Sequence, residues 1–159
     1  MSSFDESGSN RSIQTINKPS AAFIASSWVA IAVGMVAYLV GLWRSDMGLD
    51  EKGYYFTIIM YGLFAVISVQ KSVRDRLEGI PVTDLYYGLS WFSTILAIVL
   101  MVIGLWNADL LPSEKGFYGI SFLMALFGSV AVQKNTRDLN AYNKLTGSSR
   151  RQTYSEPEE

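Results

Sequence analysis

Long uncharged stretches alternate with short polar ones along this chain. Four windows contain no Asp, Glu, Lys or Arg, at residues 19–43, 53–70, 85–108 and 116–133. Crossing a hydrocarbon layer about 30 Å thick takes about 20 mostly apolar residues of α-helix. The first and third windows reach that length. The other two have 18 residues each, and flanking lysines extend their reach because long side chains snorkel to the membrane surface. The pattern predicts an all-α membrane protein with four transmembrane helices.

Polar residues at the window edges predict where the helices begin. Pro19-Ser20 is typical of a helix start with Ser20 as the N-cap, and Thr83 or Asp84 is expected to cap the third helix. Asp50 and Ser113 are expected to cap the second and fourth helices. The expected helices cover about residues 20–43, 53–72, 85–106 and 116–135. Residues 1–19 and 140–159 are polar and are expected to be disordered tails because they bury too little apolar surface to order themselves.

The second pair of helices repeats the first. Between Trp28 and Arg76, 17 of 49 residues are identical to the residue 63 positions later, without insertion or deletion, where about three matches are expected by chance. The chain therefore contains a first repeat, residues 20–78, and a second repeat, residues 79–139. A period of this length with two apolar runs indicates a duplicated two-helix hairpin.

Lysine and arginine predict the orientation in the membrane. Ten of the 13 lie in the two tails and the middle linker, and the two hairpin loops hold Arg44, Lys52 and Lys115. Because positive charge stays on the cytoplasmic side, both termini are expected there. The two hairpins would then be parallel repeats about a pseudo-twofold axis along the membrane normal. Gly34 and Gly41 are expected in helix contacts, with the first helix packing on the third or the second on the fourth.

Composition excludes several kinds of chemistry. The chain has no histidine and no cysteine, and its net charge is −1. We therefore expect no enzyme activity, no cofactor and no nucleic-acid partner. None of the four windows contains an ionisable Asp, Glu, Lys, Arg or His, whereas proton- or ion-coupled transporters place such groups near the middle of the membrane.

Two charged motifs recur in both repeats and are candidate sites. Glu51 and Glu114 would form a pair on the periplasmic side that binds a cation or a basic ligand, or they would only stabilise helix starts, which is the more common role. Gly53 and Gly116 beside them are expected to allow close contact between helix starts. The second motif predicts a cytoplasmic rim for lipid head groups or a partner protein, with ordinary anchoring of the helices as the simpler interpretation. The residues of this rim are Lys71, Arg74, Asp75, Lys134, Arg137 and Asp138.

The repeated motifs also carry a resemblance. Gly-Leu-Trp-x-x-Asp, Glu-Lys-Gly-x-Tyr and Val-Gln-Lys-x-x-Arg-Asp occur in that order in both copies. Over about residues 20–138 the chain resembles the YiaA/YiaB family, which is built from the YiaAB two-helix domain. The resemblance implies a four-helix protein of the bacterial inner membrane. It implies no molecular activity.

These observations favour an integral inner-membrane protein with a structural or interaction role, binding lipid or another membrane protein. The alternative is a subunit of an oligomeric pore or small-solute transporter whose path lies between protomers. Membrane lipids are the expected partners, together with a second copy of the chain or another membrane protein.

Overall fold

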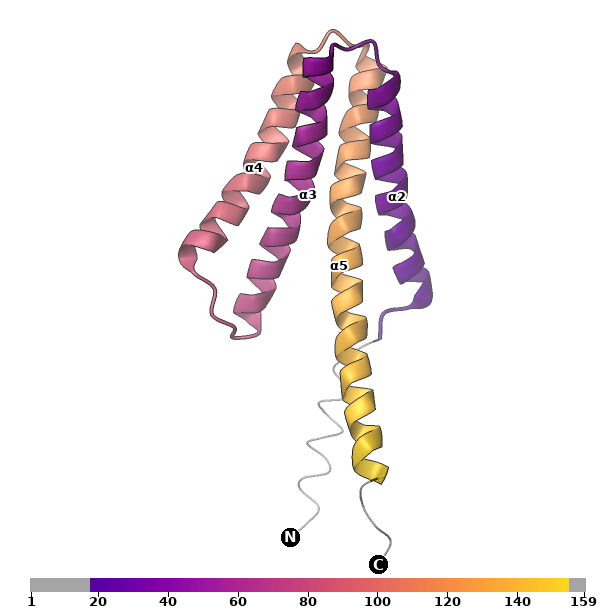
Figure 1. The fold of residues 1–159 in the computed structure, drawn as a ribbon, viewed down its shortest axis with the longest axis vertical. Helices are drawn as coiled ribbons and strands as arrows, with labels where there is room; N and C mark the ends of the chain where they lie inside the picture. The colour runs from indigo at the N-terminus through magenta and orange to yellow at the C-terminus, as the bar shows by residue number, and fades with distance from the viewer. Residues whose placement is uncertain (1–17, 155–159) are drawn as a thin grey trace, which may run out of the picture. The chain divides into compact units, whose positions relative to one another are not determined.

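The computed structural model describes residues 18–154, and only the backbone of residues 148–154. It contains four helices, which are α2 (Ala21–Arg44), α3 (Leu49–Leu77), α4 (Asp84–Asn107) and α5 (Pro112–Tyr154) (Figure 1). Loops at residues 45–48, 78–83 and 108–111 join them. Each helix contains a stretch long and apolar enough to cross a membrane. The predicted all-α fold with four membrane-spanning helices is confirmed.

Two of the expected helix caps are present. The Ser20 hydroxyl accepts a hydrogen bond from the Phe23 backbone N–H at 3.2 Å, and the Thr83 hydroxyl accepts one from the Tyr86 N–H at 3.3 Å. The other two predicted caps are wrong. Asp50 lies inside the first turn of α3, which follows Gly48, and Ser113 lies inside the first turn of α5. Pro112 takes the first helical position, where its missing N–H costs nothing.

The described chain forms two compact units, residues 26–132 and residues 18–25 with 133–154. In the smaller unit, the Asn135 side-chain amide donates to the Phe23 carbonyl at 3.4 Å. The Lys18 ammonium lies 5.7 Å from the ring centre of Tyr142. The expected disordered tail from residue 140 is not found for residues 140–154, which continue α5. Polar residues such as Asn, Lys and Arg do not end a helix by themselves, and no proline lies in this stretch. Residues 1–17 and 155–159 lie outside the described residues.

In the larger unit each helix pairs with a helix of the other repeat. α3 runs along α4. α2 lies against α5, because a Cβ built on Gly34 would lie 2.6 Å from the Ala125 backbone nitrogen, and one built on Gly128 would lie 2.5 Å from that of Ile31. Glycines permit this close approach. The expected helix contact at Gly34 is confirmed, but its partner is α5, the fourth helix, and not the third.

Aromatic side chains fill the space between the repeats. The Tyr38 side chain is fully buried, and its hydroxyl donates to the Tyr55 carbonyl at 2.8 Å. The Tyr38 ring meets the Tyr118 ring edge-on at 5.7 Å. The core around this group contains residues of all four helices, namely Tyr38, Leu42, Tyr55, Ile58, Ile59, Met101, Tyr118, Phe122, Ala125 and Leu126. Each repeat therefore buries its apolar face against the other.

Candidate binding site at the acidic end

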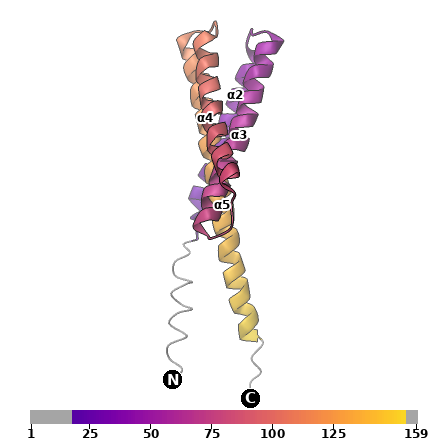
Figure 2. The same cartoon turned by 90° about the vertical axis from the view of Figure 1, so that its left-hand side faces the viewer.

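The loops 45–48 and 108–111 lie at one end of the larger unit, where the first helix of each repeat ends and the second begins. We call this the acidic end, because five carboxylates lie in or beside these loops. They belong to Asp46, Asp50, Glu51, Asp109 and Glu114. Figure 2 shows the two loops standing apart, one from each repeat.

Glu51 and Glu114 stabilise the starts of their own helices. The Glu51 carboxylate accepts a hydrogen bond from the Gly48 backbone N–H at 3.1 Å, and the Glu114 carboxylate accepts one from the Leu111 N–H at 2.9 Å. A carboxylate at this position satisfies an N–H that the helix leaves unbonded and interacts favourably with the helix dipole. One oxygen of each carboxylate is therefore already used.

The lysines that follow these glutamates bind the preceding helix. The Lys52 ammonium donates to the Trp43 carbonyl at 3.2 Å, and the Lys115 ammonium donates to the Trp106 carbonyl at 3.4 Å. A cation at a helix C-terminus satisfies a free carbonyl and complements the dipole. The repeated Glu-Lys pair thus fixes the corner between the two helices of a repeat.

The glycines after the lysines have no packing role. A Cβ built on Gly53 or on Gly116 would meet no other atom within 4 Å. The expectation that these glycines permit close contact between helix starts is therefore wrong. The close approaches occur one turn from the ends of α2 and α4, at Gly41 and Gly104.

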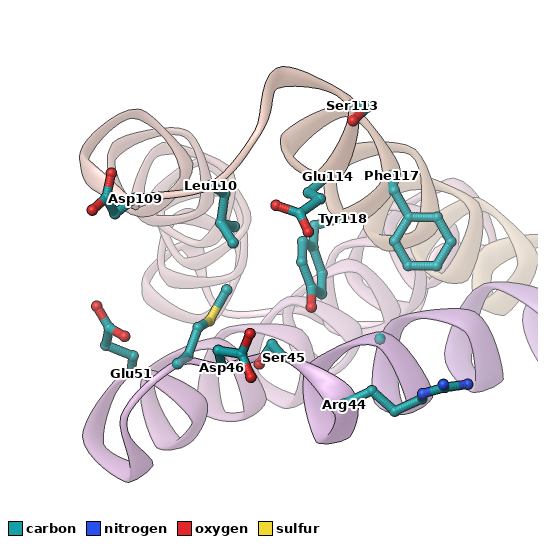
Figure 3. Close-up of a pocket in the computed structure, with 12 residues that line it drawn as sticks. Arg44, Ser45, Asp46, Glu51, Asp109, Leu110, Ser113, Glu114, Phe117 and Tyr118 are labelled. Carbon is teal, nitrogen blue, oxygen red and sulfur yellow. The ribbon is translucent and has the colours of Figure 1, made fainter.

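A cavity of about 620 Å³ opens at the acidic end. Both repeats contribute to it, and Glu51 and Glu114 are both among its lining residues (Figure 3). Their role as a paired binding site stays a prediction. The cavity also holds Asp46 and Asp109, which recur in the repeat but were not among the predicted site residues. The remaining lining residues are Gly41, Arg44, Ser45, Met47, Leu110, Ser113, Phe117 and Tyr118.

The Tyr118 side chain lines this cavity, and its hydroxyl points toward Ser45 and Asp46 in Figure 3. The Ser45 hydroxyl donates to the Leu42 carbonyl at 2.7 Å. Its lone pairs therefore remain available as acceptors. The Tyr118 side chain is only 4% exposed, so the cavity ends on an aromatic floor.

A second, smaller cavity of about 320 Å³ lies at the same end. Most of its lining residues are the repeat partners of residues in the larger cavity. Gly104, Asn107 and Ala108 stand 63 positions after Gly41, Arg44 and Ser45. Asp50, Glu51, Tyr54 and Tyr55 likewise stand 63 positions before Ser113, Glu114, Phe117 and Tyr118. Ile103 completes its lining. The duplication has thus produced two related cavities, of which only the larger contains an arginine.

The residues of the predicted rim belong to different units. Lys71, Arg74 and Asp75 lie in the last turns of α3, where Arg74 forms an ion pair with Glu78 at 2.9 Å. Lys134, Arg137 and Asp138 lie in α5 and belong to the smaller unit. There Lys134 forms an ion pair with Asp138, four residues later on the same helix face, at 3.5 Å. The equivalence of the two halves of the rim stays a prediction.

The described part of the chain contains no metal centre. Among residues 18–154, no group of three or more Asp and Glu side chains is placed to hold a metal ion. The buried side-chain oxygen of Gln70 has no hydrogen-bond partner among these residues.

Comparison with known proteins agrees with this repeated architecture. The profile of the yiaA/B two helix domain family matches the chain twice, at residues 23–75 and 86–138. The chain belongs to this family. Each match covers one α-helical hairpin, from α2 into α3 and from α4 into α5.

Two relatives come from Escherichia coli strain K12. The chain is 54% identical to "Inner membrane protein YiaA" over 123 residues, which cover 77% of this chain and 85% of that protein. It is 32% identical to "Inner membrane protein YiaB" over 101 residues, which cover 62% of this chain and 83% of that protein. No solved structure matches the chain. The protein is therefore a multi-pass protein of the bacterial inner membrane, and neither relative's name states an enzymatic activity.

Proposed function

We propose that this protein is a lipid-binding membrane protein without enzyme activity, and that the cavity at the acidic end is its binding site. The observation that carries this proposal is a 620 Å³ space lined by both repeats at the ends of the membrane-spanning helices. Ligand sites commonly have this size and combine an apolar wall with a few polar groups. Here Phe117 and Tyr118 supply aromatic walls, and the serines and charged residues supply the polar groups.

The chemistry of the lining favours binding over catalysis. The carboxylates of Glu51 and Glu114 are engaged at helix starts, and the chain has no histidine or cysteine to act as a base or nucleophile. An oligomeric pore is the second candidate. Within residues 26–132 the space between the repeats is filled by Tyr38, Tyr55 and Phe122, so a path through one protomer is blocked and a pore would need several.

The test is purification of the full chain in mild detergent, followed by lipid extraction and identification of co-purifying proteins. We expect lipid to be retained at a fixed ratio to protein. A Ser113→Trp variant, which fills the cavity, should lose most of it, whereas Ile80→Trp in the opposite loop should not. Equal retention by both variants would contradict the proposed site. A membrane protein that always co-purifies, with no retained lipid, would favour an interaction role with that protein instead.

A further inference from the structure

An apolar groove lies on the outer face of α2, next to the cavity at the acidic end. It has a volume of about 510 Å³ and almost no polar lining. Gly41 and Phe117 line both spaces, so the polar cavity and the groove meet at these two residues. The groove is otherwise formed by Ala32, Val33, Val36, Ala37 and Val40. A ligand that occupies both spaces must have one charged end and one apolar end.

Small residues in the first repeat create this groove. Ala32 and Ala37 stand where the second repeat has Ile95 and Leu100. Ala32 and Ala37 line the groove, whereas Leu100 packs against the core between the repeats. The larger side chains of the second repeat would narrow such a groove. The two copies of the hairpin therefore differ at the place where the acyl chain of a ligand would lie.

Charge differs between the copies in the same region. Arg44 ends α2 beside the groove, and Asn107 takes its place in the second repeat. Figure 3 shows the Arg44 guanidinium on the same side of the cavity as Phe117, with Asp46 and Glu114 farther in. Arg44 forms no ion pair with any described carboxylate, and Asp46 makes no hydrogen bond with any described residue. One cationic group and several carboxylates therefore line the same cavity without being paired with one another.

We propose that this combined site binds one phospholipid whose head group carries a primary ammonium. This inference rests on the proposed lipid-binding function and specifies the class of lipid. An acyl chain lies in the groove on α2, the phosphate meets the Arg44 guanidinium, and the ammonium meets the carboxylates of Asp46 and Glu114. Charge-assisted hydrogen bonds of both signs recognise such a zwitterion. A lipid with an uncharged alcohol head group would leave the carboxylates without a cation.

The full chain in detergent is titrated with three dioleoyl phospholipids, which carry ethanolamine, choline or glycerol head groups, and adducts are measured by native mass spectrometry. We expect the ethanolamine lipid to bind about tenfold more tightly than the glycerol lipid, since one charge-assisted contact is gained. The choline lipid should fall between them because its ammonium has no N–H to donate. Free phosphoethanolamine at the same concentration should not compete, because it lacks the acyl chain.

Two variants locate the site. Each replaces a residue of the first repeat by the residue at the matching position of the second repeat. Arg44→Asn and Ala37→Leu should each weaken ethanolamine-lipid binding about tenfold, while Arg44→Lys should keep most of it. The matched controls are Lys144→Asn, on the exposed surface of α5, and Val99→Leu, on the exposed face of α4. Thermal unfolding of each variant identifies any that fails to fold. If Arg44→Asn does not fold, the three lipids are compared on Arg44→Lys instead.

Each result has a distinct meaning. If the parent protein binds none of the three lipids, the lipid-binding function itself is wrong. If it binds all three equally, only the head-group assignment is overturned. A preference for the ethanolamine lipid that survives in both Arg44→Asn and Ala37→Leu would show that the lipid binds elsewhere on the protein. Competition by free phosphoethanolamine would overturn the lipid as the ligand.

Discussion

The rings of Tyr55 and Tyr118, which hold matching positions in the two repeats, stack on each other with their centres 6.2 Å apart and their planes 19° from parallel. Tyr38 and Met101 also match, and the Tyr38 hydroxyl lies 3.8 Å from the Met101 sulfur. Residues at the same place in two copies contact one another only near the axis that relates the copies. Within residues 26–132, the repeats therefore meet about a twofold axis that passes between these pairs.

The glycines near the ends of α2 and α4 confirm this reciprocity. A Cβ on Gly41 would lie 2.7 Å from the Phe117 ring, and a Cβ on Gly104 would lie 2.7 Å from the Tyr54 ring. Phe117 and Tyr54 hold matching positions. Each repeat therefore receives an aromatic side chain of the other against its glycine, which is the relationship that a twofold axis produces.

Tyr38→Phe should destabilise the protein by about 1 kcal/mol, because it removes a buried hydrogen bond to the Tyr55 carbonyl while it keeps the ring packing. Thermal unfolding in detergent, followed by tryptophan fluorescence, measures the change. Tyr61→Phe is the matched control, since Tyr61 lies on α3 with no hydrogen bond from its hydroxyl to the described residues. Equal effects of both substitutions would show that the Tyr38 hydroxyl contributes nothing specific.

Gly34→Ala should lower thermal stability, and Gly34→Leu should lower it further. The first added carbon would lie 2.6 Å from the Ala125 backbone nitrogen, so α2 and α5 must move apart and lose packing over the whole contact. Gly53→Ala is the control, because its Cβ would meet no other atom within 4 Å. It should leave stability unchanged or raise it by up to about 1 kcal/mol through its better helix propensity. A stable Gly34→Leu protein would mean that this face of α2 is not a helix contact.

The four helices could be predicted from the sequence because the uncharged windows leave few alternatives in a membrane. The positions at which the helices begin were predicted less accurately. Gly48 and Leu111 precede the second helix of each repeat, and neither has a capping side chain. The N–H groups there are satisfied by glutamates three residues later. Of the two residues of a capping box, the sequence therefore contains only the glutamate and not the capping side chain before it.

Which helices pack on one another could not be predicted from the sequence, for a different reason. A duplicated hairpin offers each apolar face two similar partners, one in its own copy and one in the other, and periodicity does not distinguish them. The choice depends on details such as the approach of Gly128 to Ile31. At the candidate site, Glu51 and Glu114 were singled out because they occur at matching positions of both repeats. Asp46 and Asp109 recur as clearly, but the arginine and the groove are visible only where the copies differ, as at Ala37 and Leu100.

Glu51→Ala and Glu114→Ala should each cost about 1 kcal/mol of stability, because a backbone N–H at a helix start loses its acceptor. Glu51→Gln and Glu114→Gln keep an acceptor oxygen and should cost less. The two repeats should respond alike, since the hydrogen bonds match. Unfolding temperatures of the four variants test this expectation, and a large loss in the Gln variants would show that the negative charge itself, and not the hydrogen bond, stabilises these ends.

The distribution of charge predicts the orientation in the membrane. The acidic end holds the two loops 45–48 and 108–111, whereas the loop 78–83 lies at the other end of the larger unit with Arg74 and Arg76 beside it. Because positive charge stays on the cytoplasmic side, we expect loop 78–83 to face the cytoplasm and the acidic end to face the periplasm. The chain has no cysteine, so single cysteines at positions 48 and 80 can be labelled without background. In intact spheroplasts an impermeant maleimide should label position 48 and leave position 80 unlabelled until the cells are lysed. Labelling of position 80 alone would reverse the orientation, and with it the side of the membrane from which the acidic cavity is reached.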